Sequence, residues 1–182
     1  MIYSKEDFYF QLPSNAVVAE VGVLTGENAK TIKNITHPSK LVLVDYWAHL
    51  SDREDSIHFS VATDWNRVFG SARNAFKGDD TVFFVAAMSW QAASLFADQY
   101  FDWVFVDASH TYEDCMKDLK AWYPKVKSGG YLCGHDYVDN AMTQAKGWGV
   151  KRAVDTFMSD KGLSIEFTSN EVAARYAIRV RH

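Results

Sequence analysis

Carboxylate and imidazole side chains recur along this chain directly after short apolar runs, at the points where strands would end. A carboxylate in such a place can pair with an ammonium group, accept hydrogen bonds from sugar hydroxyls or bind a divalent cation. An imidazole can take up a proton near neutral pH. The residues concerned are Glu20, Asp45, Asp107, His110, His135 and Asp136.

These side chains can meet only if the apolar runs are strands of one sheet. Short β-branched runs alternate with segments of helical period, which is typical of a parallel sheet covered by helices on both faces. Strands are expected over residues 16–23, 41–45, 81–86, 101–107 and 131–135, with an antiparallel hairpin over 164–168 and 174–180. Helices are expected over 26–32, 64–76, 89–96 and 149–158, and from 112 to the stop signal Ser128-Gly129-Gly130. The pattern predicts an α/β, doubly wound sheet, whose ligands bind beyond the carboxyl ends of its strands.

Length, composition and charge limit the function classes. At 182 residues, 48% of them apolar, the chain is expected to form one domain, residues 1–182, with a packed core. The net charge of −4 argues against a nucleic-acid partner. Charges at positions 5–7 and the lack of an apolar window near 18 residues argue against a signal peptide or a membrane span, so a cytoplasmic protein is expected.

Two smaller features are interpreted as structural. The cysteines, Cys115 and Cys133, show no metal-type spacing and are expected to be buried thiols. Three arginines alternate near the C-terminus along an expected edge strand and are interpreted as a solvated face: Arg175, Arg179 and Arg181.

Two glycines mark the first strand-to-helix turn, in the segment Glu20-Val-Gly22-Val-Leu-Thr-Gly26. Glycines let the backbone approach a ligand closely, but the spacing lacks the Gly-x-Gly-x-x-Gly fingerprint of dinucleotide sites. Glu20 would repel a pyrophosphate and could pair with an ammonium group, whereas Asp45 could accept hydrogen bonds from a ribose. A ligand with an amine and a ribose but no phosphate fits both. An ordinary tight turn and a helix cap at Asp45 are the alternatives.

The pattern Glu-x-Gly-x-x-x-Gly after one strand and Asp45 after the next resembles the cofactor site of class I S-adenosylmethionine-dependent methyltransferases. The segments 107–118 (DASHTYEDCMKD), 129–137 (GGYLCGHDY) and 149–154 (GVKRAV) are similar to a family of small-molecule O-methyltransferases within that class, related to macrolide and aminocoumarin sugar methyltransferases. The resemblance runs from about residue 17 to residue 157. It implies a Rossmann-like sheet of seven strands, mostly parallel with the last strand antiparallel.

The resemblance also implies how the cofactor would be held. Glu20 would meet the methionine amino group of S-adenosylmethionine, Gly22 and Gly26 the cofactor backbone, and Asp45 the ribose hydroxyls.

The adenine would lie at Met88 and Ser89 by the same resemblance, and the neighbouring Trp90 is expected to pack rather than stack on the base. Other tryptophans would suit a sugar ring or a planar acceptor if they lie at the mouth of the site: Trp47, Trp65 and Trp148.

A second group of side chains follows the fourth and fifth predicted strands. Asp107 and the pair His135-Asp136 should meet there, because adjacent strands lie about 5 Å apart. The related methyltransferases hold Mg²⁺ with an Asp after the fourth strand and an acidic pair after the fifth, where this chain has His135 in place of the first acid. Asp107, His135 and Asp136 are therefore predicted to bind a divalent metal, Mg²⁺ or Mn²⁺, and the imidazole favours Mn²⁺, Fe²⁺ or Zn²⁺. The alternative is that His135 caps a loop and binds nothing.

His110 lies three residues after Asp107 in a loop that opens a helix. In relatives with the same Asp-x-x-His arrangement a histidine takes the proton from the substrate hydroxyl, and the resemblance gives that catalytic role to His110, beside Asp107. The alternative is a capping or core histidine. The predicted reaction is in-line transfer of the sulfonium methyl group to a hydroxyl of a small-molecule acceptor, assisted by the metal.

Other functions stay open at this stage. The Asp and His cluster could belong to a metal-dependent hydrolase or oxygenase, or the chain could be a non-catalytic S-adenosylmethionine-binding module. The polar stretch 49–62 lacks periodicity and is a candidate lid over the site. Because short methyltransferase cores often dimerise to complete their sites, a homodimer is a further expectation by analogy.

Overall fold

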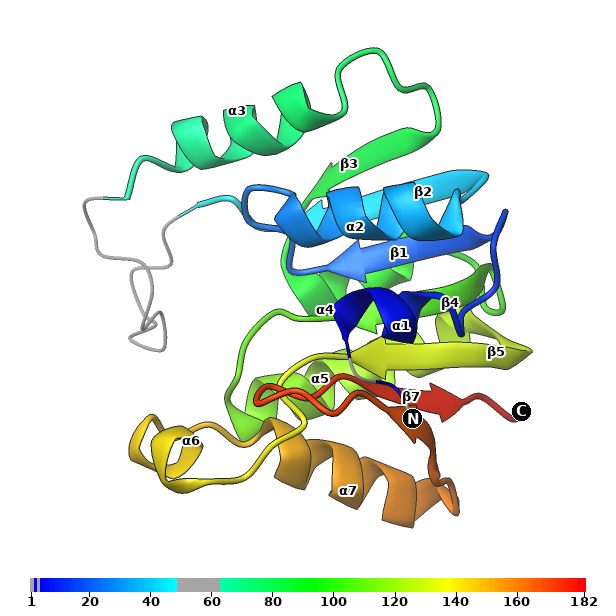
Figure 1. Ribbon diagram of the computed structural model, residues 1–182, viewed down its shortest axis with the longest axis vertical. Coiled ribbons are helices and arrows are strands. Elements are labelled where there is room, and N and C mark those ends of the chain that lie inside the picture. The colour runs from blue at the N-terminus through cyan, green and yellow to red at the C-terminus, as the bar shows by residue number, and fades with distance from the viewer. Residues whose placement is uncertain (1, 3, 49–62) are drawn as a thin grey trace.

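The computed structural model describes residues 2, 4–48 and 63–182, which form a seven-stranded sheet between two layers of helices (Figure 1). The strand order is β3-β2-β1-β4-β5-β7-β6. Strands β1 to β5 run parallel, and β7 is antiparallel to both β5 and β6. The strands are β1 (Val17–Val21), β2 (Lys40–Asp45), β3 (Val82–Ala86), β4 (Phe101–Val106), β5 (Val126–Gly134), β6 (Ile165–Thr168) and β7 (Tyr176–Arg179). The predicted Rossmann-like fold class is confirmed.

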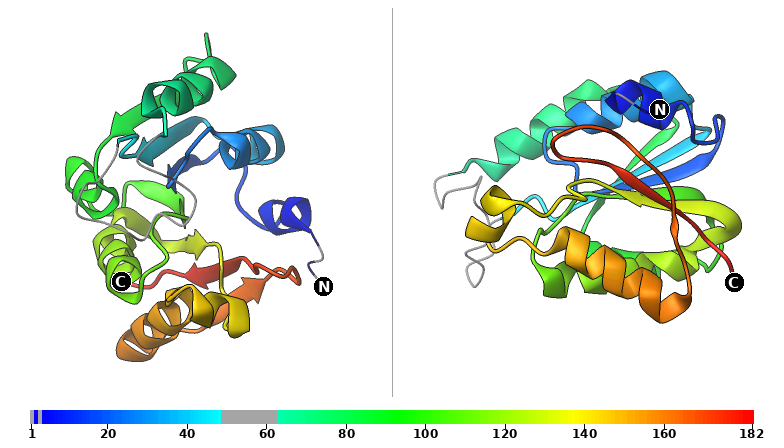
Figure 2. Two further views of the ribbon diagram at one scale, coloured as in Figure 1. Left: turned by 90° about the vertical axis from the view of Figure 1, so that its left-hand side faces the viewer. Right: turned by 60° about the horizontal axis from the view of Figure 1, so that its bottom comes forward.

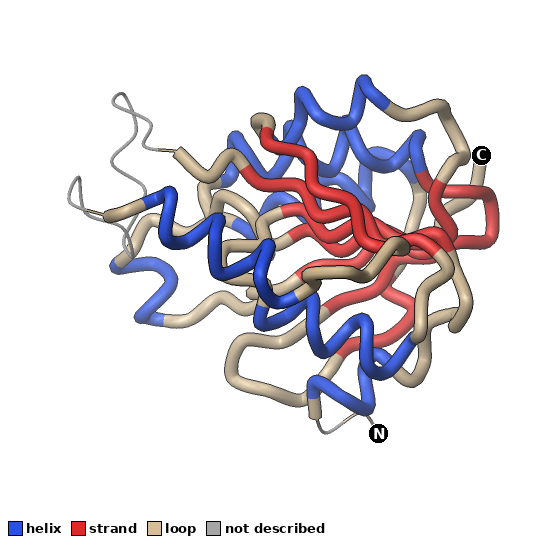
Figure 3. The backbone as a smooth tube through the Cα atoms, turned by 90° about the horizontal axis from the view of Figure 1, so that it is seen from above, coloured by secondary structure: helices blue, strands red, loops and turns tan. Residues whose placement is uncertain are grey.

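Helices cover both faces of the sheet, as Figures 2 and 3 show. One face is covered by α1 (Lys5–Tyr9), α2 (Glu27–Thr36) and α3 (Trp65–Ala75). The other face is covered by α4 (Ser89–Ala92), α5 (Tyr112–Trp122) and α7 (Val150–Lys161). Strand residues alternate between the two cores, because successive side chains of a strand point to opposite faces. Val18 belongs to the core under α1 and α2, for example, and Ala19 to the core under α5 and α7.

The connection from α5 to β5 differs from the prediction. Helix α5 ends at Trp122, a 3₁₀ turn follows (Tyr123–Lys125), and β5 begins at Val126. The turn contains Pro124, which has no backbone N–H to continue a helix. Gly130 lies inside the strand, where a Cβ atom would come within 2.3 Å of the Asp102 carbonyl oxygen. The expectation that residues 128–130 stop the helix is therefore wrong, because they form an irregular stretch of β5 instead.

Two short helices were not predicted, α1 and α6 (Ala141–Ala145). Ser4 caps α1 by accepting a hydrogen bond from the Asp7 amide at 3.0 Å, and Asn140 with Thr143 forms a capping box at α6. Each helix has five residues, too few to show a helical period.

The C-terminal hairpin places its first arginine inside the molecule. Strand β7 lies between β5 and β6 and is not an edge strand. Arg175, directly before β7, is only 8% exposed. The interpretation of the arginine row as a solvated face is therefore wrong for Arg175, although Arg181 is exposed.

Three other expectations concern the chain as a whole. The candidate lid, 49–62, lies outside the described residues. In the described part of the chain, every helix is too short or too polar to span a bilayer. Cys115 and Cys133 are buried and free, as expected.

Candidate functional site

The carboxyl ends of the parallel strands lie together at one edge of the sheet, on the left in Figure 1. The turn after β1 approaches the turn after β4 there, since Asp107 N donates to Val21 O at 2.7 Å. Gly22 has φ +90°, and a Cβ atom on it would lie 1.9 Å from the Asp107 carbonyl oxygen. Only glycine fits this position, in conformation and in space. Gly26 also has a left-handed φ, +87°, where α2 begins.

Glu20 is buried beneath this turn and is 1% exposed. Its Oε1 accepts a hydrogen bond from Asn28 Nδ2 at 2.9 Å, and Asn28 Oδ1 accepts one from the Tyr9 hydroxyl at 2.8 Å. Its Oε2 has no hydrogen-bond partner among the described residues. Burial raises the pKa of Glu20 to about 8, against the opposing effect of the Asn28 hydrogen bond. The carboxyl group is thus a buried acceptor with one oxygen to spare.

Asp45 holds the glycine turn in shape. Its Oδ2 accepts hydrogen bonds from the amides of Val23 and Leu24, each at 2.8 Å, and its Oδ1 accepts one from Trp47 N at 3.0 Å. The side chain is half-buried, and a carboxylate has about four acceptor positions, so it can still accept a hydrogen bond from a ligand. Its predicted contact with a ribose stays a prediction.

Trp47 lies beside the same turn but not at the mouth of a site. Its Nε1 donates to Leu24 O at 2.8 Å, and its ring stacks on Phe69 at 4.5 Å between centroids. Trp47 is buried, so its role is to anchor the turn rather than to contact an acceptor.

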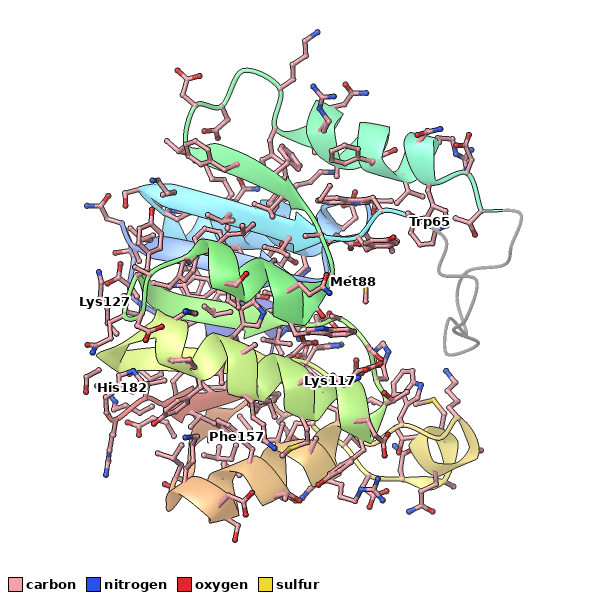
Figure 4. The ribbon with its side chains drawn as sticks, turned by 180° about the vertical axis from the view of Figure 1, so that it is seen from behind. Trp65, Met88, Lys117, Lys127, Phe157 and His182 are labelled. Atoms are coloured by element: carbon pink, nitrogen blue, oxygen red, sulfur yellow. The ribbon has the colours of Figure 1, made fainter. Side chains whose placement is uncertain are left out.

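Met88 and Ser89 lie where β3 meets α4, at the same edge of the sheet (Figure 4). Ser89 O accepts a hydrogen bond from Trp122 Nε1 at 3.1 Å, which ties α4 to α5. The ring of Trp90 lies under Lys117 Nζ, 4.8 Å from the ring centroid. Trp90 is half-buried and belongs to neither hydrophobic core, so its packing stays a prediction, as do the adenine contacts of Met88 and Ser89.

Two histidines share one carboxylate at the ends of β4 and β5. Asp136 Oδ2 lies 3.0 Å from His110 Nε2 and 3.1 Å from His135 Nδ1. His135 Nδ1 also lies 3.8 Å from Asp107 Oδ2. The predicted cluster is therefore formed, because β4 and β5 pair in parallel and end side by side.

The ionisable groups of this cluster shift one another's pKa values. Burial raises the pKa of Asp136, but hydrogen bonds from His110 and His135 outweigh it, and the pKa lies well below the ordinary value. Burial lowers the pKa of His135, whereas the hydrogen bond to Asp136 and the charge of Asp107 raise it, with a net rise. Burial raises the pKa of Asp107. Asp136 is thus ionised, and the imidazoles of His110 and His135 both hydrogen-bond to it.

A metal could be held by this cluster. Donor atoms of Asp107, His110 and Asp136 all lie within 4.8 Å of one another. Two carboxylates and an imidazole are a donor set for a divalent transition cation. The predicted ligand His135 is not in this converging set, although its Nδ1 lies 3.8 Å from Asp107 Oδ2 and 3.1 Å from Asp136 Oδ2.

Trp148 fixes the ring of His110, which sequence reasoning did not foresee. The two rings stack at 4.1 Å between centroids, with an interplanar angle of 15°. Gly149 N donates to His110 O at 2.8 Å, and a Cβ atom on Gly149 would meet Tyr112 Cβ at 2.7 Å. His110 is thus held in a small pocket that Asp107, His135 and Asp136 also line.

Three further residues of the site were not predicted from the sequence to belong to it. Asn28 and Tyr9 lie under Glu20, and Arg175 approaches the cluster from the β6–β7 hairpin, since its charge acts on Asp107 and His135. Asn28 lies in the first turn of α2, where a polar side chain close to a buried Glu could have been noticed.

The chain matches known proteins in its sequence pattern and in its fold. A family model described as a methyltransferase domain matches residues 19–137. A comparison with curated protein sequences finds no match.

Solved structures share the fold at low sequence identity. Aeropyrum pernix fibrillarin in complex with S-adenosyl-L-methionine has a TM-score of 0.62 at 15% identity, covering 91% of this chain and 67% of its own. The N-methyltransferase NodS from Bradyrhizobium japonicum has a TM-score of 0.67 at 13% identity, covering 98% and 95%. The S-adenosylhomocysteine-bound methyltransferase PaMTH1 from Podospora anserina has a TM-score of 0.65 at 15% identity, covering 98% and 78%.

Proposed function

The chain belongs to the methyltransferase-domain family, and from this premise we propose that it transfers a methyl group from S-adenosylmethionine to a hydroxyl oxygen of a small molecule. The observation that carries the choice of a hydroxyl is the pairing of His110 with Asp136 at 3.0 Å beside the cofactor edge. A hydroxyl must lose its proton as its oxygen forms the new bond, and an oriented imidazole is the group that accepts such a proton at neutral pH.

The donor would bind at the ends of β1, β2 and β3. S-adenosylmethionine supplies an electrophilic methyl group on a sulfonium centre. Glu20 has a buried oxygen free to accept from the ammonium group, and the turn at Gly22 and Gly26 brings backbone close to the ligand. Asp45 would accept hydrogen bonds from the ribose hydroxyls, and Met88 and Ser89 lie at the neighbouring strand end for the adenine.

The proton would pass to His110. In the tautomer with its proton on Nε2, His110 donates to Asp136, and Nδ1 carries the basic lone pair. As the acceptor oxygen bonds to the methyl carbon, the bond to sulfur breaks and its electron pair stays on sulfur. The stack on Trp148 keeps the imidazole in one orientation, which serves the alignment on which in-line transfer depends.

Metal assistance is part of the proposal. Two imidazoles face the same carboxylates, so one can bind a cation while the other takes the proton. We assign His135 to a divalent cation, with Asp107 and Asp136, because its Nδ1 lies 3.8 Å and 3.1 Å from their oxygens. Such a cation would lower the pKa of a bound hydroxyl and fix its position. An imidazole in the set favours Mn²⁺ over Mg²⁺.

The rival functions explain less of the site. A hydrolase or oxygenase would use the metal cluster but gives no reason for an unsatisfied carboxylate buried under a glycine turn. A non-catalytic binding module would need the turn and Glu20 but not a histidine held between a carboxylate and a tryptophan ring. Assembly as a homodimer remains part of the proposal by analogy alone.

The experiment that tests this function measures S-adenosylhomocysteine formation with a panel of sugars, catechols and other hydroxylated acceptors, with Mn²⁺ present. We expect turnover with at least one acceptor class and a fall in kcat of roughly 10²- to 10⁴-fold in His110→Ala, with unchanged cofactor binding. Thr156→Ala, which removes a hydroxyl that donates only to Arg152 O within α7, is a control that should keep full activity. Full activity of His110→Ala would contradict the assigned base.

A further inference from the structure

Arg175 lies in the C-terminal hairpin, at the edge of the sheet where the carboxyl ends of the parallel strands meet. The pairing of Gly134 with Tyr176 sets Arg175 beside His135, one residue beyond the ladder between β5 and β7. The pairing of Val106 with Gly134 likewise sets Asp107 beside His135. Figure 1 shows that the hairpin turn lies at the edge toward which β5 points. Residues Asp107, His135 and Arg175 thus follow three neighbouring strands in one row.

Side chains alternate between the two faces of the sheet along each strand, so the strand residues in the cores show which face Asp107, His135 and Arg175 lie on. Phe105, Cys133 and Ala177, each two residues away from a member of the row, belong to the core under α1 and α2. The row therefore faces the same side of the sheet as α1 and as Glu20, two residues after Val18 of that core.

Arg175 is buried but incompletely paired. It is 8% exposed, one Nη donates to Glu171, and its backbone amide donates to Ser169 Oγ at 2.8 Å. Its Nε is buried and has no hydrogen-bond partner among the described residues. A buried guanidinium group without full pairing is costly, so this donor indicates a ligand that the fold is built to receive.

The guanidinium group lies close to the groups that lead to Glu20. Burial raises the pKa of Asp107 and Tyr9, and the charge of Arg175 acts against this rise; the same charge lowers the pKa of His135. A side-chain hydrogen bond between Arg175 and Tyr9 also lowers the pKa of Tyr9. Tyr9 in turn donates to Asn28, and Asn28 donates to Glu20. The Nε donor of Arg175 and the Oε2 acceptor of Glu20 thus both lack a hydrogen-bond partner among the described residues. The side chains of Tyr9 and Asn28 connect the two groups.

We infer that Arg175 binds the carboxylate of the methionine part of S-adenosylmethionine, while Glu20 takes the ammonium group of the same α-amino acid. This assignment rests on the proposed function and deepens it. The Nε–H and an Nη–H of a guanidinium group can donate in parallel to the two oxygens of one carboxylate. An edge lined by Glu20, Asp45, Asp107 and Asp136 would repel a carboxylate without such a cation.

Lys5 is the competing cation. It lies at the start of α1, and its charge lowers the pKa of Glu20. Its ammonium group is a point charge on a side chain that is only partly buried, whereas the guanidinium group of Arg175 is buried with a free donor. The geometry therefore favours Arg175 for the carboxylate.

The test compares two ligands by calorimetric titration: S-adenosylmethionine, and its decarboxylated form, which keeps the sulfonium and ammonium groups but lacks the carboxylate. The full chain should bind S-adenosylmethionine roughly 10- to 100-fold more tightly than the decarboxylated form, as expected for a charge-assisted pair. Arg175→Met should lose this preference, with the affinity for the decarboxylated ligand unchanged, which also shows that the variant is folded.

Two control variants separate the alternatives. Glu171→Gln removes the ion pair within the hairpin but keeps the guanidinium group, and it should retain the preference. Lys5→Met should retain it too. The inference is overturned if Arg175→Met keeps the preference, or if it weakens both ligands equally. A full chain that binds neither ligand overturns the proposed function itself, so the two failures are distinct.

Discussion

Glu20 is a carboxyl group that the fold buries without satisfying both of its oxygens. Its ordinary pKa is near 4.5, and in the folded chain burial raises it to about 8. Between these pH values the folded state binds more protons than the unfolded state. The stability that this group contributes is therefore present below its unfolded pKa and is lost as the pH rises through 8. Burying the ionised Glu20 carboxylate destabilises the folded chain, and this supports its proposed role in binding a ligand.

Glu20→Gln should separate stability from binding. We expect a higher melting temperature than that of the natural chain above pH 8, because the amide carries no charge to bury, and an affinity for S-adenosylmethionine that falls roughly 10- to 100-fold. In the natural chain the affinity should rise with pH up to about 8, as the carboxylate forms, and Glu20→Gln should lack that rise. Thermal melts and titrations from pH 6 to pH 9 measure both. A variant that binds as tightly as the natural chain would exclude the ammonium contact.

Metal binding should depend more strongly on His135 than on His110. His135→Gln is expected to weaken Mn²⁺ binding roughly 10- to 100-fold, as measured by the electron paramagnetic resonance of free Mn²⁺, whereas His110→Gln should weaken it less. The reverse order would make His110 the ligand, which the convergence of Asp107, His110 and Asp136 within 4.8 Å also permits, and would remove it as the base.

At the scale of elements, the site depends on the close approach of the turns after β1 and β4. Gly22→Ala would place a Cβ atom 1.9 Å from the Asp107 carbonyl oxygen and force a left-handed φ on alanine. Gly78→Ala has a similar φ, +82°, with nothing within 4 Å, and serves as the matched control. We expect the control to lose about 1–2 kcal/mol of unfolding free energy, and Gly22→Ala to lose more, together with cofactor binding. Equal losses in urea titrations would show that the approach is unimportant.

The strands could be predicted because each is an apolar run of several residues, as buried strands are. The alternation of strands with helices along the chain then indicated a parallel sheet. The short helices α1 and α6 could not, since five residues give no period. Among the site residues, Asp107, His135 and Asp136 were expected to meet because they end paired strands. The stack of Trp148 on His110 and the burial of Arg175 could not be predicted, since both depend on contacts between distant segments.

At the level of the whole molecule, the residues proposed for the cofactor and those proposed for proton transfer lie on different halves of the sheet. The strand order reverses at β1, which pairs with β2 on one side and β4 on the other. Such a switch point is where α/β sheets bind ligands. The residues proposed for the nucleoside follow β2 and β3, and those proposed for proton transfer and metal follow β4 and β5. The methyl group would cross between the two halves, above β1.

Calorimetric titration of S-adenosylmethionine into the full chain and into Asp45→Ala is the first measurement to make on the proposed cofactor site. Asp45 holds the glycine turn through the backbone amides of Val23 and Leu24 and is assigned to the ribose. We expect saturable binding of one cofactor per chain, with or without Mn²⁺, and its loss in Asp45→Ala. A chain that binds Mn²⁺ at the Asp and His cluster but shows no heat and no thermal shift with S-adenosylmethionine would contradict this expectation.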